Sequence, residues 1–165
     1  MTDLTQERLK ELLHYDEDTG VFVWRHSSFG VNEGDIAGCE NSNGYIRIKI
    51  DGQSYKSHRL AVLYCIGSWP VNQIDHIDGV RTNNSIFNLR EATQTENVRN
   101  SRIFHNNTSG VKGVNWNKLK CKWQARLSTD VGRKHLGYFT TIEEADKVVR
   151  AAREKYHGEF ANHGN

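Results

Sequence analysis

The segment from residue 74 to residue 100 constrains this chain most, because its residue types suit chemistry better than core packing. Its 27 residues, IDHIDGVRTNNSIFNLREATQTENVRN, place many Asp and Asn side chains around one histidine, His76. Asp and Asn supply oxygen ligands for a hard divalent cation. A histidine titrates near neutral pH and can take a proton from water. A metal site and a base in one segment indicate phosphodiester hydrolysis.

The spacing within this segment is more specific than its composition. Asp75 and His76 are followed by Asn88, twelve residues after the histidine, and by Asn97, twenty-one after it. This spacing resembles the HNH nuclease motif, in the phage and intron-encoded homing-endonuclease branch. The phrase DHIDG…TNNSIFNLREAT…EN and the upstream order of hairpin, HR-helix and turn resemble the same branch.

The resemblance implies a role for each of these residues. His76 is expected to be the base, and Asp75 and Asn97 are expected to hold Mg²⁺ or Mn²⁺. Asn88 would hold the loop or His76 in orientation. Two alternatives stay open: His76 as a structural histidine at a strand end, and Asn100, one helical turn further on, as the ligand in place of Asn97.

Composition excludes several other classes of protein. With 165 residues and 36% apolar content, the chain can form one ordinary domain or two small ones. It has no apolar run that could span a bilayer and no signal-peptide pattern, so a cytoplasmic protein without membrane contact is expected. Cys39, Cys65 and Cys121 are far apart without a CxxC pair, so neither disulfides nor zinc are expected. Some HNH proteins carry a zinc knuckle, and we expect none in this chain.

Charge divides the chain unevenly. Residues 1–100 hold 10 Lys and Arg against 14 Asp and Glu, whereas residues 101–165 hold 12 against 6. From 101 to 139 the count is 8 against 1. Such an asymmetry favours a C-terminal part that binds the phosphate backbone of a nucleic acid. The alternative is a merely solvated basic face.

Local patterns predict the elements that precede the motif. Asp51-Gly52 is the strongest hairpin signal, and Gly67 is expected to end a helix. His58 either begins that helix with a local hydrogen bond or forms a second catalytic pair with Arg59. In the motif itself, Phe87 and Leu89 are expected to be buried. The predicted elements are a helix at 4–14, an acidic turn at 16–20, strands at 21–25, 45–50, 53–57 and 74–77, a helix at 58–66, and a helix from Thr93 or Thr95.

Residues 110–161 are predicted to form a second unit of three strands and one helix. The strands are expected at 110–116, 122–127 and 133–139, and Thr141 with Glu144 forms a capping box for the helix. The phrases SGVKGVNWN, KWQARL and HLGYF resemble the Apetala-2/ethylene-response-factor DNA-binding domain, which lays its sheet in the DNA major groove. For Trp116 and Trp123, packing against the helix is an equal alternative to contact with the DNA groove. The predicted DNA-binding residues are Trp116, Lys118, Lys122, Trp123, Arg126, Arg133 and Lys134.

The predicted fold class is α+β. It comprises an N-terminal ββα-metal (HNH) nuclease domain at 1–100 with its motif core at 58–100, a linker at 101–109, and a small three-stranded antiparallel sheet packed on one helix at 110–162. The predicted function is metal-dependent nicking of double-stranded DNA at a preferred site, by a monomer or a dimer without an obligatory protein partner. Alternatives are a DNA-binding regulator with an inactive nuclease domain, and an RNA-directed or unspecific nuclease.

Overall fold

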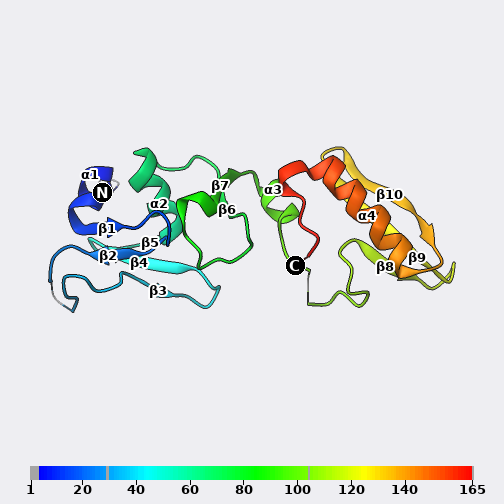
Figure 1. Cartoon of the computed structure of the whole chain (residues 1–165), viewed down its shortest axis with the longest axis horizontal. Coiled ribbons are helices and arrows are strands. Elements are labelled where there is room, and N and C mark those ends of the chain that lie inside the picture. Colours follow the sequence, from blue (N-terminus) through cyan, green and yellow to red (C-terminus); the bar gives the residue numbers. More distant parts are fainter. Residues whose placement is uncertain (1–3, 29, 104, 165) are drawn as a thin grey trace. The chain divides into compact units, whose positions relative to one another are not determined.

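The computed structural model describes residues 4–28, 30–103 and 105–164, and it forms two compact units that divide between Thr93 and Gln94 (Figure 1). The structure is mixed α/β with small antiparallel sheets, which confirms that part of the predicted fold class. In the described residues no helix combines the length and the apolar character needed to cross a bilayer. The domain limits at residues 100 and 110 stay a prediction.

The first unit contains three small antiparallel sheets: β1 with β2, β3 with β4 and β5, and β6 with β7. Two α-helices and one 3-10 turn complete the described part of this unit. In chain order its elements are α1 (Gln6–Leu12), β1 (Leu13–Tyr15), β2 (Phe22–Trp24), β3 (Cys39–Glu40), β4 (Ile46–Ile50), β5 (Gln53–Lys56), α2 (Ser57–Ile66), β6 (Gln73–His76), η1 (Ile86–Asn88) and β7 (Leu89–Ala92).

Local sequence signals explain where these elements begin and end. The Thr5 hydroxyl accepts the Arg8 amide at 3.2 Å and so caps α1. Asp51 and Gly52 both have positive φ, 47° and 83°, as the tight turn between β4 and β5 requires. Gly67 is left-handed with φ 86° and ends α2. The turn at Asp51-Gly52 and the end of α2 at Gly67 agree with the sequence prediction.

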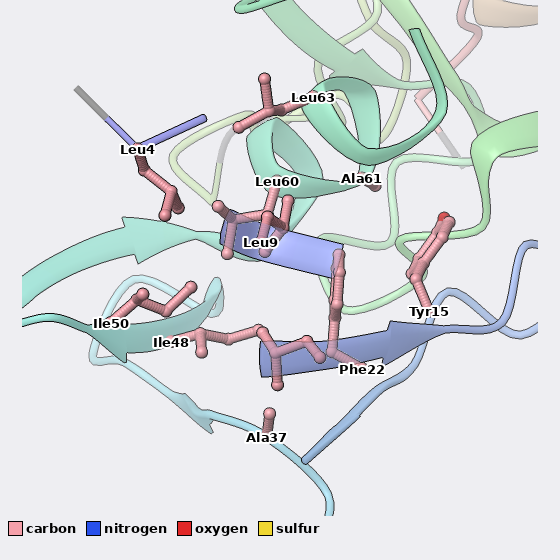
Figure 2. Packing of buried hydrophobic residues seen from close by; sticks show 11 residues of the cluster. Leu4, Leu9, Tyr15, Phe22, Ala37, Ile48, Ile50, Leu60, Ala61 and Leu63 are labelled. Atoms are coloured by element: carbon pink, nitrogen blue, oxygen red, sulfur yellow. The ribbon is translucent and has the colours of Figure 1, made fainter. Parts of the chain in front are cut away.

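One apolar core holds the helices and strands of the first unit together (Figure 2). Leu9 of α1, Leu60 of α2 and Ile48 of β4 are completely buried, and the rings of Tyr15 and Phe22 lie 4.5 Å apart. Burying side chains of this size stabilises the fold by roughly 1.5–3 kcal/mol each. The core thereby fixes α2 and the end of β1, which carry residues that contact the site described below.

The prediction that Phe87 is buried is wrong. Its side chain is 71% exposed, whereas Leu89 is half-buried against the core. The cause is the 3-10 turn η1, which interrupts the alternating pattern that the sequence suggested for 87–90. The turn directs Asn88 toward the preceding loop instead.

The second unit is a three-stranded sheet in the order β10-β9-β8, with one face covered by α4. Val114, Ala125, Ala145 and Val149 form its buried core. The capping box of Thr141 and Glu144 is present. The first strand begins at Val114, later than predicted, because 111–113 form turns. The elements are α3 (Gln94–Arg99), β8 (Val114–Asn117), β9 (Lys122–Thr129), β10 (Gly132–Phe139), α4 (Ile142–His157) and η2 (Gly158–Phe160).

Candidate functional site

The β6–β7 hairpin places Asp75 and His76 at adjacent positions of a buried strand. Asp75 is 4% exposed and lies opposite Arg90 in the strand register. Arg90 donates from Nε at 3.0 Å and from Nη2 at 2.9 Å, and both bonds go to Oδ2 of Asp75. A buried carboxylate needs such a partner, because an unpaired charge away from water is costly. The pairing of Asp75 with Arg90 was not predicted.

His76 is oriented by a hydrogen bond with Asn84, a residue to which we assigned no role from the sequence. The His76 Nε2 lies 3.2 Å from Oδ1 of Asn84, and the Asn84 amide nitrogen donates to the Thr82 carbonyl. The carbonyl oxygen of the Asn84 amide therefore faces the ring, so Nε2 carries the proton and Nδ1 carries the lone pair. Burial lowers the pKa of His76, although the Asn84 bond opposes the shift.

The acidic turn at 16–20 packs against the loop that carries Asn84. The Tyr15 hydroxyl donates to the Asn84 carbonyl at 2.7 Å, and the Ser85 hydroxyl donates to the Glu17 carbonyl at 2.9 Å. Gly20 has φ 72°, and a Cβ there would lie 2.2 Å from the Asn84 carbonyl carbon. Gly20 therefore allows the turn to approach this loop closely.

A second histidine lies against His76. The rings of His58 and His76 are 5.1 Å apart, and Tyr45 lies 5.3 Å from His58. Burial lowers the pKa of His58 to about 3, with the charge of His76 adding to the effect, so its imidazole is neutral at pH 7. The neutral His58 ring therefore packs against the His76 ring. A catalytic role for His58 with Arg59 stays an alternative.

Asn88 contacts the loop that follows β6. Its amide nitrogen donates to Asp78 Oδ1 at 3.0 Å and to the Asn83 carbonyl at 2.9 Å, and its oxygen accepts the Asp78 amide at 3.1 Å. Burial alone would raise the pKa of Asp78. Hydrogen bonds from the Val80 backbone and from the side chains of Asn83 and Asn88 outweigh it, so the pKa lies below its usual value. Of the two tasks predicted for Asn88, these bonds fit holding the loop, and Asn84 is the residue that contacts His76.

The predicted ligand Asn97 lies on α3, in the second unit, and is half-buried. The alternative ligand Asn100 is 6% exposed, and its Oδ1 accepts the Asn162 amide at 3.2 Å within the same unit. Asn100 stays the alternative ligand. The pairing of Asn97 with Asp75 stays a prediction.

The donor chemistry of Asp75 and Asn97 fits a hard cation, because a carboxylate and an amide oxygen are ligands that Mg²⁺ accepts, with waters in its other positions. Within residues 4–28, 30–103 and 105–164, no group of three or more His, Cys, Asp or Glu side chains could hold a metal ion.

The sheet of the second unit separates the predicted DNA-binding residues onto two faces. Lys122 and Arg126 alternate with the core residue Ala125, so they lie on the face away from α4. Arg133 pairs with Ser128 and lies on that open face too, and Lys118 is exposed in the turn after β8.

The remaining three predicted residues lie on the side of α4. Trp116 pairs with Trp123, their rings are 5.1 Å apart, and Trp123 packs against the core. Lys134 donates to the Tyr156 hydroxyl of α4 at 2.5 Å. The sheet therefore does not bring the tryptophans and the exposed basic residues together on one face, and core packing accounts for Trp123.

A family model matches the part of the chain that carries Asp75, His76, Asn88 and Asn97. Residues 55–99 match the family model described as HNH endonuclease. Protein 3.8 of Escherichia phage T7 is 35% identical over 88 residues, which are 53% of this chain and 72% of that protein. The chain belongs to the HNH endonuclease family. The HNH resemblance predicted from Asp75, His76, Asn88 and Asn97 is confirmed, whereas the Apetala-2 resemblance of 109–162 stays a prediction.

A solved structure with similarity to this HNH endonuclease chain is "DNA binding and cleavage by the HNH homing endonuclease I-HmuI", with 29% sequence identity and a TM-score of 0.40. The match covers 54% of this chain and 51% of that one, so the chain spans about half the length of that structure.

Proposed function

We propose that this protein is a metal-dependent DNA endonuclease that nicks double-stranded DNA at a preferred site. The observation that carries the proposal is His76, a buried histidine beside a buried carboxylate, whose ring Asn84 orients with the lone pair on Nδ1. Membership of the HNH endonuclease family supports a nuclease. A histidine held in one tautomer is prepared to accept a proton.

In the proposed reaction, Nδ1 of His76 accepts a proton from the attacking water. The water oxygen bonds to phosphorus while the bond from phosphorus to the 3′ oxygen breaks. The departing 3′ oxygen takes a proton from a solvent water, which leaves a 5′-phosphate and a 3′-hydroxyl. Asp75 and Asn97 would hold Mg²⁺ or Mn²⁺, which supplies charge stabilisation at the phosphate when bound. Asn84 keeps the imidazole in position, and Asn88 holds the loop that begins at Asp78.

Removing the metal is expected to abolish cleavage. The full chain is incubated with supercoiled phage DNA and Mg²⁺ or Mn²⁺, with and without EDTA, and nicked and linear products are separated on a gel. Nicked circles should form with either ion, disappear with EDTA and return when excess ion is added. Cleavage that persists in EDTA would remove the metal from the proposal, and linear DNA as the first product would remove nicking.

A DNA-binding regulator with an inactive nuclease domain is the second candidate function. It would bind DNA through the second unit without cutting under any metal condition. The presence of Asp75, His76, Asn88 and Asn97 together argues against loss of activity. Binding to one duplex site without nicking in either metal would favour this candidate.

The open face of the β8–β10 sheet is the proposed DNA-binding surface, through Lys122, Arg126 and Arg133. Replacing Arg126 by alanine should weaken DNA binding at all sequences and reduce the slope of log K against log salt by about 1, because one phosphate contact is lost. Fluorescence anisotropy over a salt series measures both quantities. The exposed Lys147 of α4 gives a control, since Lys147→Ala removes the same charge elsewhere. An equal slope in the two variants would contradict this surface.

A further inference from the structure

The second unit contains a cavity of about 370 Å³ between α3, the end of β9 and α4. It forms beside the start of β8, because the first residue of β8, Val114, pairs with Ala125, whereas β9 continues to Thr129. The polar residues that line it include Arg99, Ser101, Lys112, Arg153 and His157.

Three side-chain atoms of these lining residues are buried without a hydrogen-bond partner in the described part of the chain. They are Nε of Arg99, Oγ of Ser101 and Nδ1 of His157. A buried polar atom without a partner costs about 1–3 kcal/mol, so three around one cavity require polar partners there, which water or a polar ligand would supply.

The cavity also gathers buried positive charge. The Arg99 side chain is 9% exposed, Arg153 is 1% exposed, and Lys112 is half-buried. Lys112 donates to the Arg99 and Ser101 carbonyls, and Arg153 donates to the Lys112 carbonyl, but carbonyls carry no charge. Among described residues, Asp130 is the one carboxylate that pairs with any of the three cations, and its side chain is 76% exposed.

The electrostatics agree with this geometry. Burial lowers the pKa of Lys112 to about 8, and the neighbouring charge of Arg153 adds to the shift. Burial likewise lowers the pKa of Arg153, with the charge of Arg150 adding to it. An anion in the cavity would offset the cost of holding these cations away from water.

The position of the proton on the His157 ring restricts which anions can bind in the cavity. Its Nε2 lies 2.8 Å from the Ser128 carbonyl and therefore donates, so the neutral ring presents a lone pair at Nδ1. That atom needs an O–H donor, whereas Arg99 Nε and the Ser101 hydroxyl can donate to anionic oxygens. A phosphate monoester carries both kinds of oxygen near its second pKa of about 6, whereas an internal phosphodiester of DNA has no such O–H.

We propose that this cavity binds a phosphate monoester group. Two sources share this chemistry: free phosphate, and the 5′-phosphate end of a DNA strand. The second source rests on the proposed function, because strand cleavage would produce that end, whereas binding of free phosphate does not depend on it.

Binding is tested with the full chain at pH 6, by titrating sodium phosphate against sodium chloride of equal ionic strength. The Arg99 Nε–H signal in ¹H–¹⁵N spectra should shift only with phosphate, and the melting temperature should rise with phosphate concentration. Ser101→Ala should lower the affinity about fivefold through the loss of one hydrogen bond. Asp130→Asn should raise it, because the carboxylate no longer competes for Arg99.

Two variants that each remove one positive charge distinguish binding in the cavity from non-specific attraction of phosphate to the protein. Lys112→Met and Lys147→Met each remove one positive charge, but only Lys112 lines the cavity. We expect phosphate affinity to fall about tenfold or more in the first, as for a charged hydrogen bond, and to stay unchanged in the second. If Lys112→Met unfolds, the Ser101 and Asp130 variants decide alone.

The two sources are separated by oligonucleotides that differ only in a 5′-phosphate or a 5′-hydroxyl. Stronger binding of the phosphorylated strand, lost in Ser101→Ala, identifies the DNA end as ligand. Phosphate binding without this preference identifies free phosphate. If neither phosphate nor the phosphorylated strand shifts the Arg99 signal, the inference is wrong, whatever the outcome of the cleavage assay.

Discussion

Replacing His76 by alanine is expected to lower the rate of DNA cleavage by about 10²–10⁴-fold, the usual contribution of a general base. The loss should appear in the turnover rate rather than in DNA affinity, since His76 is buried in the first unit and the proposed DNA-binding surface lies on the second. Single-turnover cleavage at saturating protein measures the chemical step directly. His26→Ala is the matched control, because His26 is an exposed histidine of the same unit.

Two further variants separate the loss of a base from damage to the fold. His76→Gln keeps a polar side chain in the buried position and should be as inactive as His76→Ala. Asn84→Ala keeps the imidazole but removes the bond that selects its tautomer, so we expect a smaller loss of about tenfold, the scale of one hydrogen bond. Circular dichroism and melting temperature verify folding. Wild-type rates in both His76 variants would show that His76 is not the base.

The sequence identified the HNH family because the motif consists of residues that lie close together along the chain. Asp75 and His76 are adjacent, and Asn88 lies in the turn that closes the same hairpin. The short-range signals were equally informative: Asp51-Gly52 forms the predicted turn, and Thr141 with Glu144 forms the predicted capping box. Each depends on a few residues whose backbone preferences are strong.

The features that the sequence did not reveal depend on contacts between distant segments. Asn83 and Asn84 are alike in sequence, and only the packing of Tyr15 and Gly20 against the loop selects Asn84 to face His76. Likewise, the basic and aromatic residues of the second unit alternate along short strands. Their division between two faces depends on strand register and on the position of α4, neither of which composition determines.

The ion pair between Asp75 and Arg90 leads to the second large prediction. Replacing Arg90 by methionine should lower the free energy of unfolding by about 3–5 kcal/mol, because it leaves the Asp75 carboxylate buried without its counterion. Urea unfolding measured by fluorescence gives this value. Arg47→Met is the control: Arg47 bonds to Ser54 and to no described carboxylate, so its loss should cost about 1 kcal/mol.

The same variant tests whether Asp75 can hold a cation. In Arg90→Met, Mg²⁺ should restore part of the lost stability, since a divalent ion supplies the positive charge that the guanidinium supplied. Asp75→Asn combined with Arg90→Met removes both charges and should regain most of the stability without Mg²⁺ and gain nothing from it. If Mg²⁺ stabilised the single and the double variant equally, the ion would bind elsewhere, and Asp75 would be a structural partner of Arg90 rather than a metal ligand.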